Sequence, residues 1–186
     1  MSISKRTVAR VANRAACIFL LICAAQAQTA ITNRVTVLVG PHELHPVVRA
    51  AEDLVSDLTK VLGPGPRLVR DVAENAPVTL WVTGSENDLA GIERPKAPES
   101  FVIATARRPR GGTAIVLAGA DMRGTIYAIY HFSQQYLGVD PLYFWTDHEP
   151  PRRSRVVLPS HLRESQGPPV FRNRGWFIND EDLLTG

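Results

Sequence analysis

The sequence has few cysteines, and both lie near its beginning. Of 186 residues, only Cys17 and Cys23 are cysteines, and both belong to an apolar stretch at 15–25. The chain after this stretch has no cysteine with which to form a disulfide or a thiolate. Its fold must therefore be stabilised by an apolar core, and a composition of 45% hydrophobic and 21% charged residues is typical of a globular domain.

The sequence also lacks an apolar run long enough to cross a membrane. The run at 15–25 has 11 residues, whereas a membrane-spanning helix needs about 20. Four basic residues precede the run and Ala25-Gln26-Ala27 follows it, an order typical of a secretory signal peptide. We therefore expect residues 1–27 to be a signal peptide rather than an anchor, and the protein to be secreted or periplasmic.

A true excess of positive charge is missing as well. The net charge of +3 and the pI of 9.1 depend on the four basic residues of the expected signal peptide. Without residues 1–27 the chain has 17 Lys and Arg against 18 Asp and Glu. This balance argues against nucleic acid or a membrane surface as a partner after cleavage.

The hydrophobic pattern that is present predicts an α/β (α+β) fold. An apolar β-branched run at 35–39 predicts a buried strand, and helical spacing from Pro46 to Leu62 predicts a helix. A second helix is expected at 122–137, with Asp121 as its N-cap and Gly138 at its end. Further strands are expected at 67–70, 78–83, 101–106, 113–117 and 156–158. This order favours a mixed β-sheet with helices packed on one face.

The composition changes after residue 158. Residues 159–169 are rich in Ser, Gly, Pro and charge, which predicts a linker between domains. Residues 170–178 are again strand-like, although fewer than 20 residues follow the linker. The linker therefore separates one α/β domain from residues 170–186, which we interpret as the opening of something larger.

Two short motifs have both a chemical and a structural interpretation. The Gly119–Thr125 turn resembles a phosphate-binding turn, but its glycine spacing matches neither nucleotide-binding pattern, and a helix-capping turn is favoured. His42 and His45 resemble half a zinc site, but they are three residues apart where the metalloprotease motif needs four, which favours a solvated loop. The sequence thus predicts no metal and no cofactor.

An aromatic group follows the second predicted helix. Tyr143, Phe144 and Trp145 are consecutive, and such rings either bury against the sheet or stack on sugar faces. Burial is the favoured interpretation, and sugar contact is the alternative. No Gly-x-Ser-x-Gly motif is present, so a nucleophilic triad is not predicted.

A polar cluster ends the last strand-like segment. Asn179, Asp180, Glu181 and Asp182 follow the apolar residues directly. The structural interpretation is a solvated loop or a helix N-terminus. The functional interpretation is an active site, because acidic residues at the carboxyl end of a strand are where a β/α barrel places its chemistry.

Three segments, in order, carry a family resemblance. They are 119–130 (GADMRGTIYAIY), 137–145 (LGVDPLYFW) and 171–181 (FRNRGWFINDE). Together they resemble the N-terminal part of glycoside hydrolase family 115, the xylan α-1,2-glucuronidases, and more distantly the family 67 α-glucuronidases. The resemblance covers essentially all of the chain after the expected signal peptide.

The resemblance implies a domain organisation and a site. Residues 33–158 would be an accessory domain, similar to the one that precedes hexosaminidase barrels, and Arg172 to Asn179 would be the first strand of a (β/α)8 barrel. Asn179, Asp180 and Glu181 match the family's Asn-Asp-Glu in the region that lines the sugar site. Adjacent residues of a strand point to opposite faces, so at most one of the two acids would face the sugar. The catalytic acid and base would lie on later strands, and no complete catalytic pair is present in this chain.

The functional expectation is therefore an N-terminal fragment of a secreted hydrolase. The family activity would be removal of (4-O-methyl)glucuronic acid side chains from glucuronoxylan or a related polysaccharide, by inverting acid and base catalysis. A barrel needs about 250 residues, so we expect this chain alone to be inactive. The alternative is a non-catalytic carbohydrate-binding or interaction module that uses Tyr143, Phe144 and Trp145, and nucleotide binding at Gly119–Thr125 is a minor third.

Overall fold

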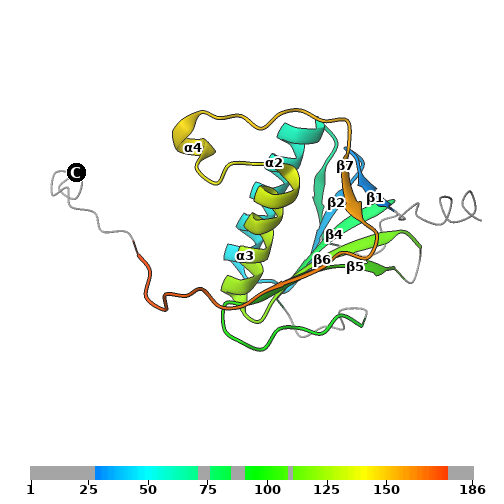
Figure 1. Ribbon diagram of the computed structural model, residues 1–186. Coiled ribbons are helices and arrows are strands. Elements are labelled where there is room, and N and C mark those ends of the chain that lie inside the picture. The colour runs from blue at the N-terminus through cyan, green and yellow to red at the C-terminus, as the bar shows by residue number, and fades with distance from the viewer. Residues whose placement is uncertain (1–27, 71–75, 85–90, 109–110, 176–186) are drawn as a thin grey trace, which may run out of the picture.

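A computed structural model describes residues 28–70, 76–84, 91–108 and 111–175 of the protein, and Figure 1 shows their arrangement. The expected signal peptide lies outside these ranges. The helical segments are α2 (His45–Leu62), α3 (Met122–Phe132), the π-helix η1 (Ser133–Leu137) and α4 (Tyr143–Thr146). The strands are β1 (Gln28–Ile31), β2 (Thr36–Val39), β3 (Arg67–Val69), β4 (Val78–Thr83), β5 (Phe101–Arg107), β6 (Thr113–Gly119), β7 (Val156–Pro159) and β8 (Arg163–Gln166).

The main sheet is mixed and has the strand order β3-β2-β4-β6-β5-β8. Strands β3, β2, β4 and β6 pair in parallel, whereas β5 is antiparallel to both β6 and β8. Strands β5 and β6 form an antiparallel hairpin, in which Arg107 pairs with Thr113 at the closed end. A separate two-stranded sheet joins β1 to β7, so that the chain near residue 28 lies beside residue 159.

Both long helices cover the same face of the main sheet, as predicted (Figure 1). Helix α2 begins with Pro46 in its first turn, buries one side and ends before Gly63. Helix α3 is capped by Asp121, and the π-helical turn η1 extends it to Gly138. Gly138 has a φ of 73°, a left-handed conformation that glycine adopts readily and that ends the helix. Among the described residues, no helix combines the length and the apolar character needed to span a bilayer.

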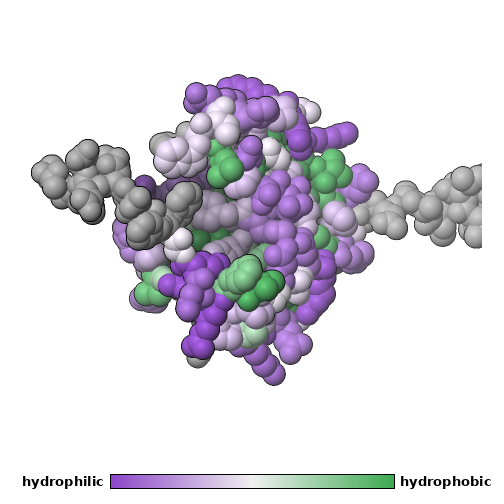
Figure 2. Space-filling view, turned by 60° about the vertical axis from the view of Figure 1, so that its left-hand side comes forward, coloured by the Kyte–Doolittle hydropathy of each residue, from purple (hydrophilic) through white to green (hydrophobic). Residues whose placement is uncertain are grey.

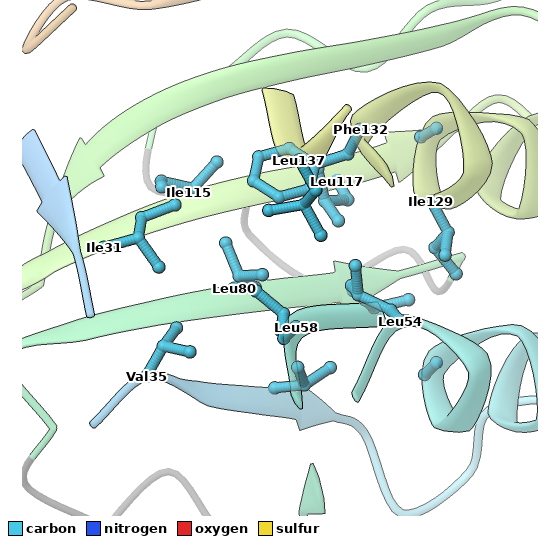
Figure 3. Close-up of a cluster of buried hydrophobic side chains, with 14 of the residues drawn as sticks. Ile31, Val35, Leu54, Leu58, Leu80, Ile115, Leu117, Ile129, Phe132 and Leu137 are labelled. Carbon is cyan, nitrogen blue, oxygen red and sulfur yellow. The ribbon is translucent and has the colours of Figure 1, made fainter. Parts of the chain in front are cut away.

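The core lies between the two helices and the sheet. Figure 3 shows Leu54 and Leu58 of α2 with Ile129 and Phe132 of α3, facing the strand residues of the sheet. Leu80, Ile115 and Leu117 come from β4 and β6, at alternate positions that point to the helical face. The opposite face has a smaller cluster of mostly small side chains, which are Val102, Ala104, Val116 and Ala118.

The segment predicted as a linker contributes a strand. Within 159–169, β8 pairs with β5 from Phe101↔Gln166 to Ala104↔Arg163 and extends the main sheet. The polar sequence Arg163-Glu-Ser-Gln166 has no apolar alternation that would predict a strand. It forms a strand because the open edge of β5 offers backbone hydrogen-bonding partners. The division into an accessory domain and a barrel stays a prediction.

The strand predicted from residue 170 onward is not present over its described part. Residues 167–175 lie in neither a helix nor a strand. A strand needs a neighbour with which to pair its backbone, and none lies beside this segment within the described residues. The remainder, from Trp176 onward, lies outside the described residues.

Candidate functional site

The residues predicted to line a sugar site are not placed. Asn179, Asp180 and Glu181 lie outside the described residues. The described segment 167–175 leads to them directly, so its position is the nearest structural information about that site. The question for the described residues is therefore what holds this segment.

The Gly119–Thr125 turn has the favoured structural role. Asp121 accepts a hydrogen bond from the Gly124 amide at 2.8 Å, as an N-cap does. A Cβ on Gly119 would lie 2.0 Å from the Thr125 nitrogen, and one on Gly124 would lie 2.2 Å from the Ser100 carbonyl oxygen. Both glycines therefore allow close backbone packing between helix α3 and the sheet, which accounts for their spacing without a phosphate.

The two histidines of the half-motif lie at the surface, beside the first turn of helix α2. His42 and His45 are both exposed at the start of α2, as the solvated-loop interpretation predicts. No three His, Cys, Asp or Glu side chains come close enough together to hold a metal ion in the part of the chain that the structure describes.

The aromatic group divides between the core and the surface. Tyr143 packs against the main core, and the Lys60 ammonium lies 3.9 Å from its ring centroid in a cation–π contact. Trp145 is 77% exposed, and Leu142 beside it is also exposed. The burial interpretation is therefore wrong for Trp145, whose side chain on the short helix α4 is largely exposed to solvent.

A polar cluster centres on Glu99, just before β5. One carboxylate oxygen accepts from Arg123 at 2.8 Å, and the other accepts from Arg174 at 2.5 Å. Arg174 also donates to the Tyr127 hydroxyl at 3.0 Å and to the Phe171 carbonyl. We call Glu99, Arg123, Tyr127 and Arg174 the Glu99 cluster; it joins segment 167–175 to helix α3 and to the turn before β5.

The charges of this cluster support one another. The hydrogen bonds from Arg123 and then Arg174 hold the pKa of Glu99 below its ordinary value of 4.5. The Glu99 side chain is 16% exposed, whereas the Arg123 side chain is largely solvated. Glu99 is therefore ionised at neutral pH, and its carboxylate is the negatively charged acceptor for both guanidinium groups.

A cleft lies beside the cluster. It has a volume of about 720 Å³, and it is lined by Pro98, Glu99, Asp121, Arg123, Pro168, Pro169, Arg172 and Asn173. One wall belongs to the domain and the other to segment 167–175, so the cleft exists only while that segment stays in place. Figure 2 shows a mainly hydrophilic surface on one face of the molecule, with separate hydrophobic patches.

A second polar cluster fastens strand β8. Glu164 accepts from the Tyr136 hydroxyl at 2.6 Å, and its other oxygen lies 2.6 Å from His131 Nε2. Burial alone would raise the pKa of Glu164, but the hydrogen bonds with Tyr136 and His131 outweigh it, and the pKa is lowered. Because η1 places Tyr136 and α3 places His131, this cluster ties the edge strand to the helical layer.

Sequence reasoning missed both clusters. Glu99 and Arg174 are 75 positions apart, and Tyr136 and Glu164 are 28 apart. Nothing in the local pattern marks them, because charged residues in loops are usually solvated. The prolines around Glu99 and before Arg172 were the only signal that these loops are conformationally restricted.

Comparison with known proteins bears on the fold. No family model matches the chain, and no curated protein matches it. A solved structure of a family GH115 4-O-methyl-α-glucuronidase, BtGH115A, described as specific for decorated arabinogalactans, is similar with a TM-score of 0.58 and 23% sequence identity. The match covers 74% of this chain and 18% of that chain. The chain therefore has a fold found within part of a family 115 enzyme, and it spans about a fifth of that enzyme's length.

Proposed function

We propose that this chain is the amino-terminal part of a secreted glycoside hydrolase of the α-glucuronidase type. The observation that carries the proposal is the fold match to part of a GH115 4-O-methyl-α-glucuronidase. The order of the three sequence segments that resemble family 115 supports it independently. In this proposal the described residues form the accessory domain, and segment 167–175 leads into the first strand of a catalytic (β/α)8 barrel.

The proposed reaction needs two carboxyl groups on opposite sides of a glycosidic bond. One protonates the leaving oxygen while the other activates a water molecule, with a separation of roughly 6.5–9.5 Å between them for inversion. Asp180 and Glu181 are too close in sequence to supply both groups. One of them, together with Asn179, would contact the glucuronic acid, and the principal acid and base would come from later strands.

The substrate in this proposal is a polysaccharide with (4-O-methyl)glucuronic acid side chains, such as glucuronoxylan. The similar enzyme is described as specific for decorated arabinogalactans, so that polysaccharide belongs in the same assay. The present chain alone should be inactive, because most of the barrel would lie outside it.

The test compares the 186-residue chain with a longer protein that continues the same reading frame. We expect the longer protein, and not the chain, to release 4-O-methylglucuronic acid from one of the two polysaccharides. Of Asp180→Asn and Glu181→Gln in the longer protein, one should lower kcat/KM by about 100-fold or more and the other by much less, since neighbouring strand residues face opposite sides. Glu52→Gln, on the exposed side of α2, is the matched control.

Absence of release from any glucuronic acid-bearing polysaccharide would contradict the proposal. Equal losses in the two acid variants would contradict the assignment of a single sugar-facing acid.

The exposure of Trp145 favours a second candidate, a carbohydrate-binding surface on this domain. An exposed indole offers a flat apolar face for a sugar ring, and Leu142, three residues earlier, is also exposed. Isothermal titration of residues 28–175 with xylo-oligosaccharides would detect it. Binding that Trp145→Ala abolishes and Tyr130→Phe leaves intact would support this surface, and no heat of binding for the unmodified domain would exclude it.

A further inference from the structure

Segment 167–175 is not held to the domain by apolar burial. Its two large apolar side chains, Val170 and Phe171, are 93% and 73% exposed. It belongs to no helix or strand, so it has no ladder of backbone hydrogen bonds to fix it. Its side-chain contacts with the domain must therefore determine its position.

Arg174 makes those contacts. Its guanidinium group reaches Glu99 at 2.5 Å and the Tyr127 hydroxyl at 3.0 Å, and it lies 6.0 Å from the Tyr127 ring centroid. It also donates to the Phe171 carbonyl within its own segment. One side chain thus bonds the turn before β5, helix α3 and the segment itself, which is a use suited to the planar, many-donor guanidinium.

Glu99 is itself held rigidly enough to act as an anchor. Its φ is 60°, in the left-handed region that residues other than glycine seldom adopt. Asp121 fixes this conformation, because one of its carboxylate oxygens accepts from the Glu99 amide at 2.9 Å while the other caps helix α3. The anchor is therefore built on the helix cap and does not depend on the surface loop alone.

The geometry points to Glu99 and Arg174 as positioning residues that set the direction in which the chain leaves this domain toward Asn179, Asp180 and Glu181. The inference about catalysis rests on the proposed function. Arg174 lies five residues before Asn179, so a segment released from Glu99 would leave the first polar residues of the sugar site without a fixed starting point.

Order in the segment can be measured on this chain by itself. In ¹⁵N relaxation experiments, residues 171–175 should have order parameters close to those of the sheet in the unmodified chain. Glu99→Gln and Arg174→Gln should each lower them to below about 0.6, whereas the exposed pair variant Glu52→Gln should not. Arg174→Lys, which keeps the charge and loses the planar fork, should give intermediate values.

The longer protein separates positioning from stability. Glu99→Gln should lower kcat about tenfold and leave KM within about twofold, because the substrate contacts remain but their alignment is lost. Arg174→Lys should have a higher kcat than Arg174→Gln, and a loss of folded protein would not explain that difference.

Each result decides one claim. Unchanged order parameters in Glu99→Gln would overturn the anchoring role. Lowered order with unchanged kcat would overturn the positioning role. A longer protein with no activity would overturn the proposed function, and the order parameters would then decide the anchoring role alone.

Discussion

Asp57 is a buried carboxyl group in the layer between the helices. It lies on α2 with 5% of its surface exposed, and burial raises its pKa above the ordinary 3.8, although the nearby Ser133 hydroxyl and Lys60 partly offset this. A raised pKa in the folded state means that the native protein binds the proton more tightly than the unfolded chain. The destabilisation from this group is therefore absent well below pH 3.8, grows as the pH rises from 3.8 to the folded-state pKa, and is constant above it.

Asp57→Asn should accordingly stabilise the protein at neutral pH. We expect the free energy of unfolding at pH 7 to rise by about 0.5–2 kcal/mol, because the amide carries no charge to desolvate. The difference from the unmodified chain should vanish near pH 3. Urea unfolding at both pH values measures this, with the exposed Asp140→Asn as the control, and an equal gain at both pH values would contradict the charge explanation.

Gly124 is a position in α3 at which alanine should be poorly tolerated. Alanine in a helix is usually favoured over glycine by about 1 kcal/mol. Here a Cβ would meet the Ser100 carbonyl oxygen at 2.2 Å, and that oxygen already accepts from the Ala120 amide. Gly124→Ala should therefore destabilise the protein by about 1–3 kcal/mol in thermal unfolding, whereas Gly167→Ala, with no atom within 4 Å of its Cβ, should have little effect.

At the scale of elements, β8 depends on the side-chain cluster around Glu164. The strand is four residues long and lies at the edge of the sheet, beside β5 only. Besides its pairing with β5, the bonds from Tyr136 and His131 to Glu164 tie this strand to the helical layer. The π-helical turn η1 matters here because it sets the position of Tyr136.

Tyr136→Phe tests that dependence. Loss of the hydroxyl should lower the free energy of unfolding by about 1 kcal/mol and should accelerate amide exchange in 163–166 more than in β4 or β6. Tyr130→Phe removes a comparable hydrogen bond, the one to Asp53 at 2.7 Å, and serves as the control. The assignment would be contradicted if amide exchange in β8 became faster in Tyr130→Phe and stayed unchanged in Tyr136→Phe.

At the scale of the whole molecule, the folded unit extends beyond the predicted domain of 33–158 at both ends. Strand β1, which lies before residue 33, pairs with β7, and its residue Ile31 is fully buried in the core. Strand β8 covers the edge of β5 after residue 158. Strand β1 ties residues 28–31 to β7, whereas β8 covers what would otherwise be an open edge of the main sheet.

A fragment of residues 28–175 should therefore be more stable than a fragment of residues 33–158. We expect the shorter fragment to unfold at a lower denaturant concentration or to aggregate through β5, because it loses the buried Ile31 and exposes an edge. Circular dichroism and sedimentation of the two fragments measure this. Equal unfolding midpoints would show that β1 and β8 are dispensable.

The sequence by itself determined the elements whose signals are local. Helix α2, the cap at Asp121, the stop at Gly138 and strand β4 follow from periodicity and from residues within a few positions of each other, and all are confirmed. The two-helix, mixed-sheet fold could be predicted for the same reason. The terminal Asn179-Asp180-Glu181 site was predicted from resemblance and stays a prediction.

Only the tertiary structure decided the pairings between distant parts of the chain. Strands β1 and β8 have no strand pattern of their own and exist because open edges of β7 and β5 accept their backbone hydrogen bonds. The Glu99 cluster likewise joins residues 75 positions apart, which no local pattern encodes. The exposure of Trp145 depends on where α4 lies on the fold. Local preferences select helices and strands, whereas contacts across the folded chain select their partners and their exposure.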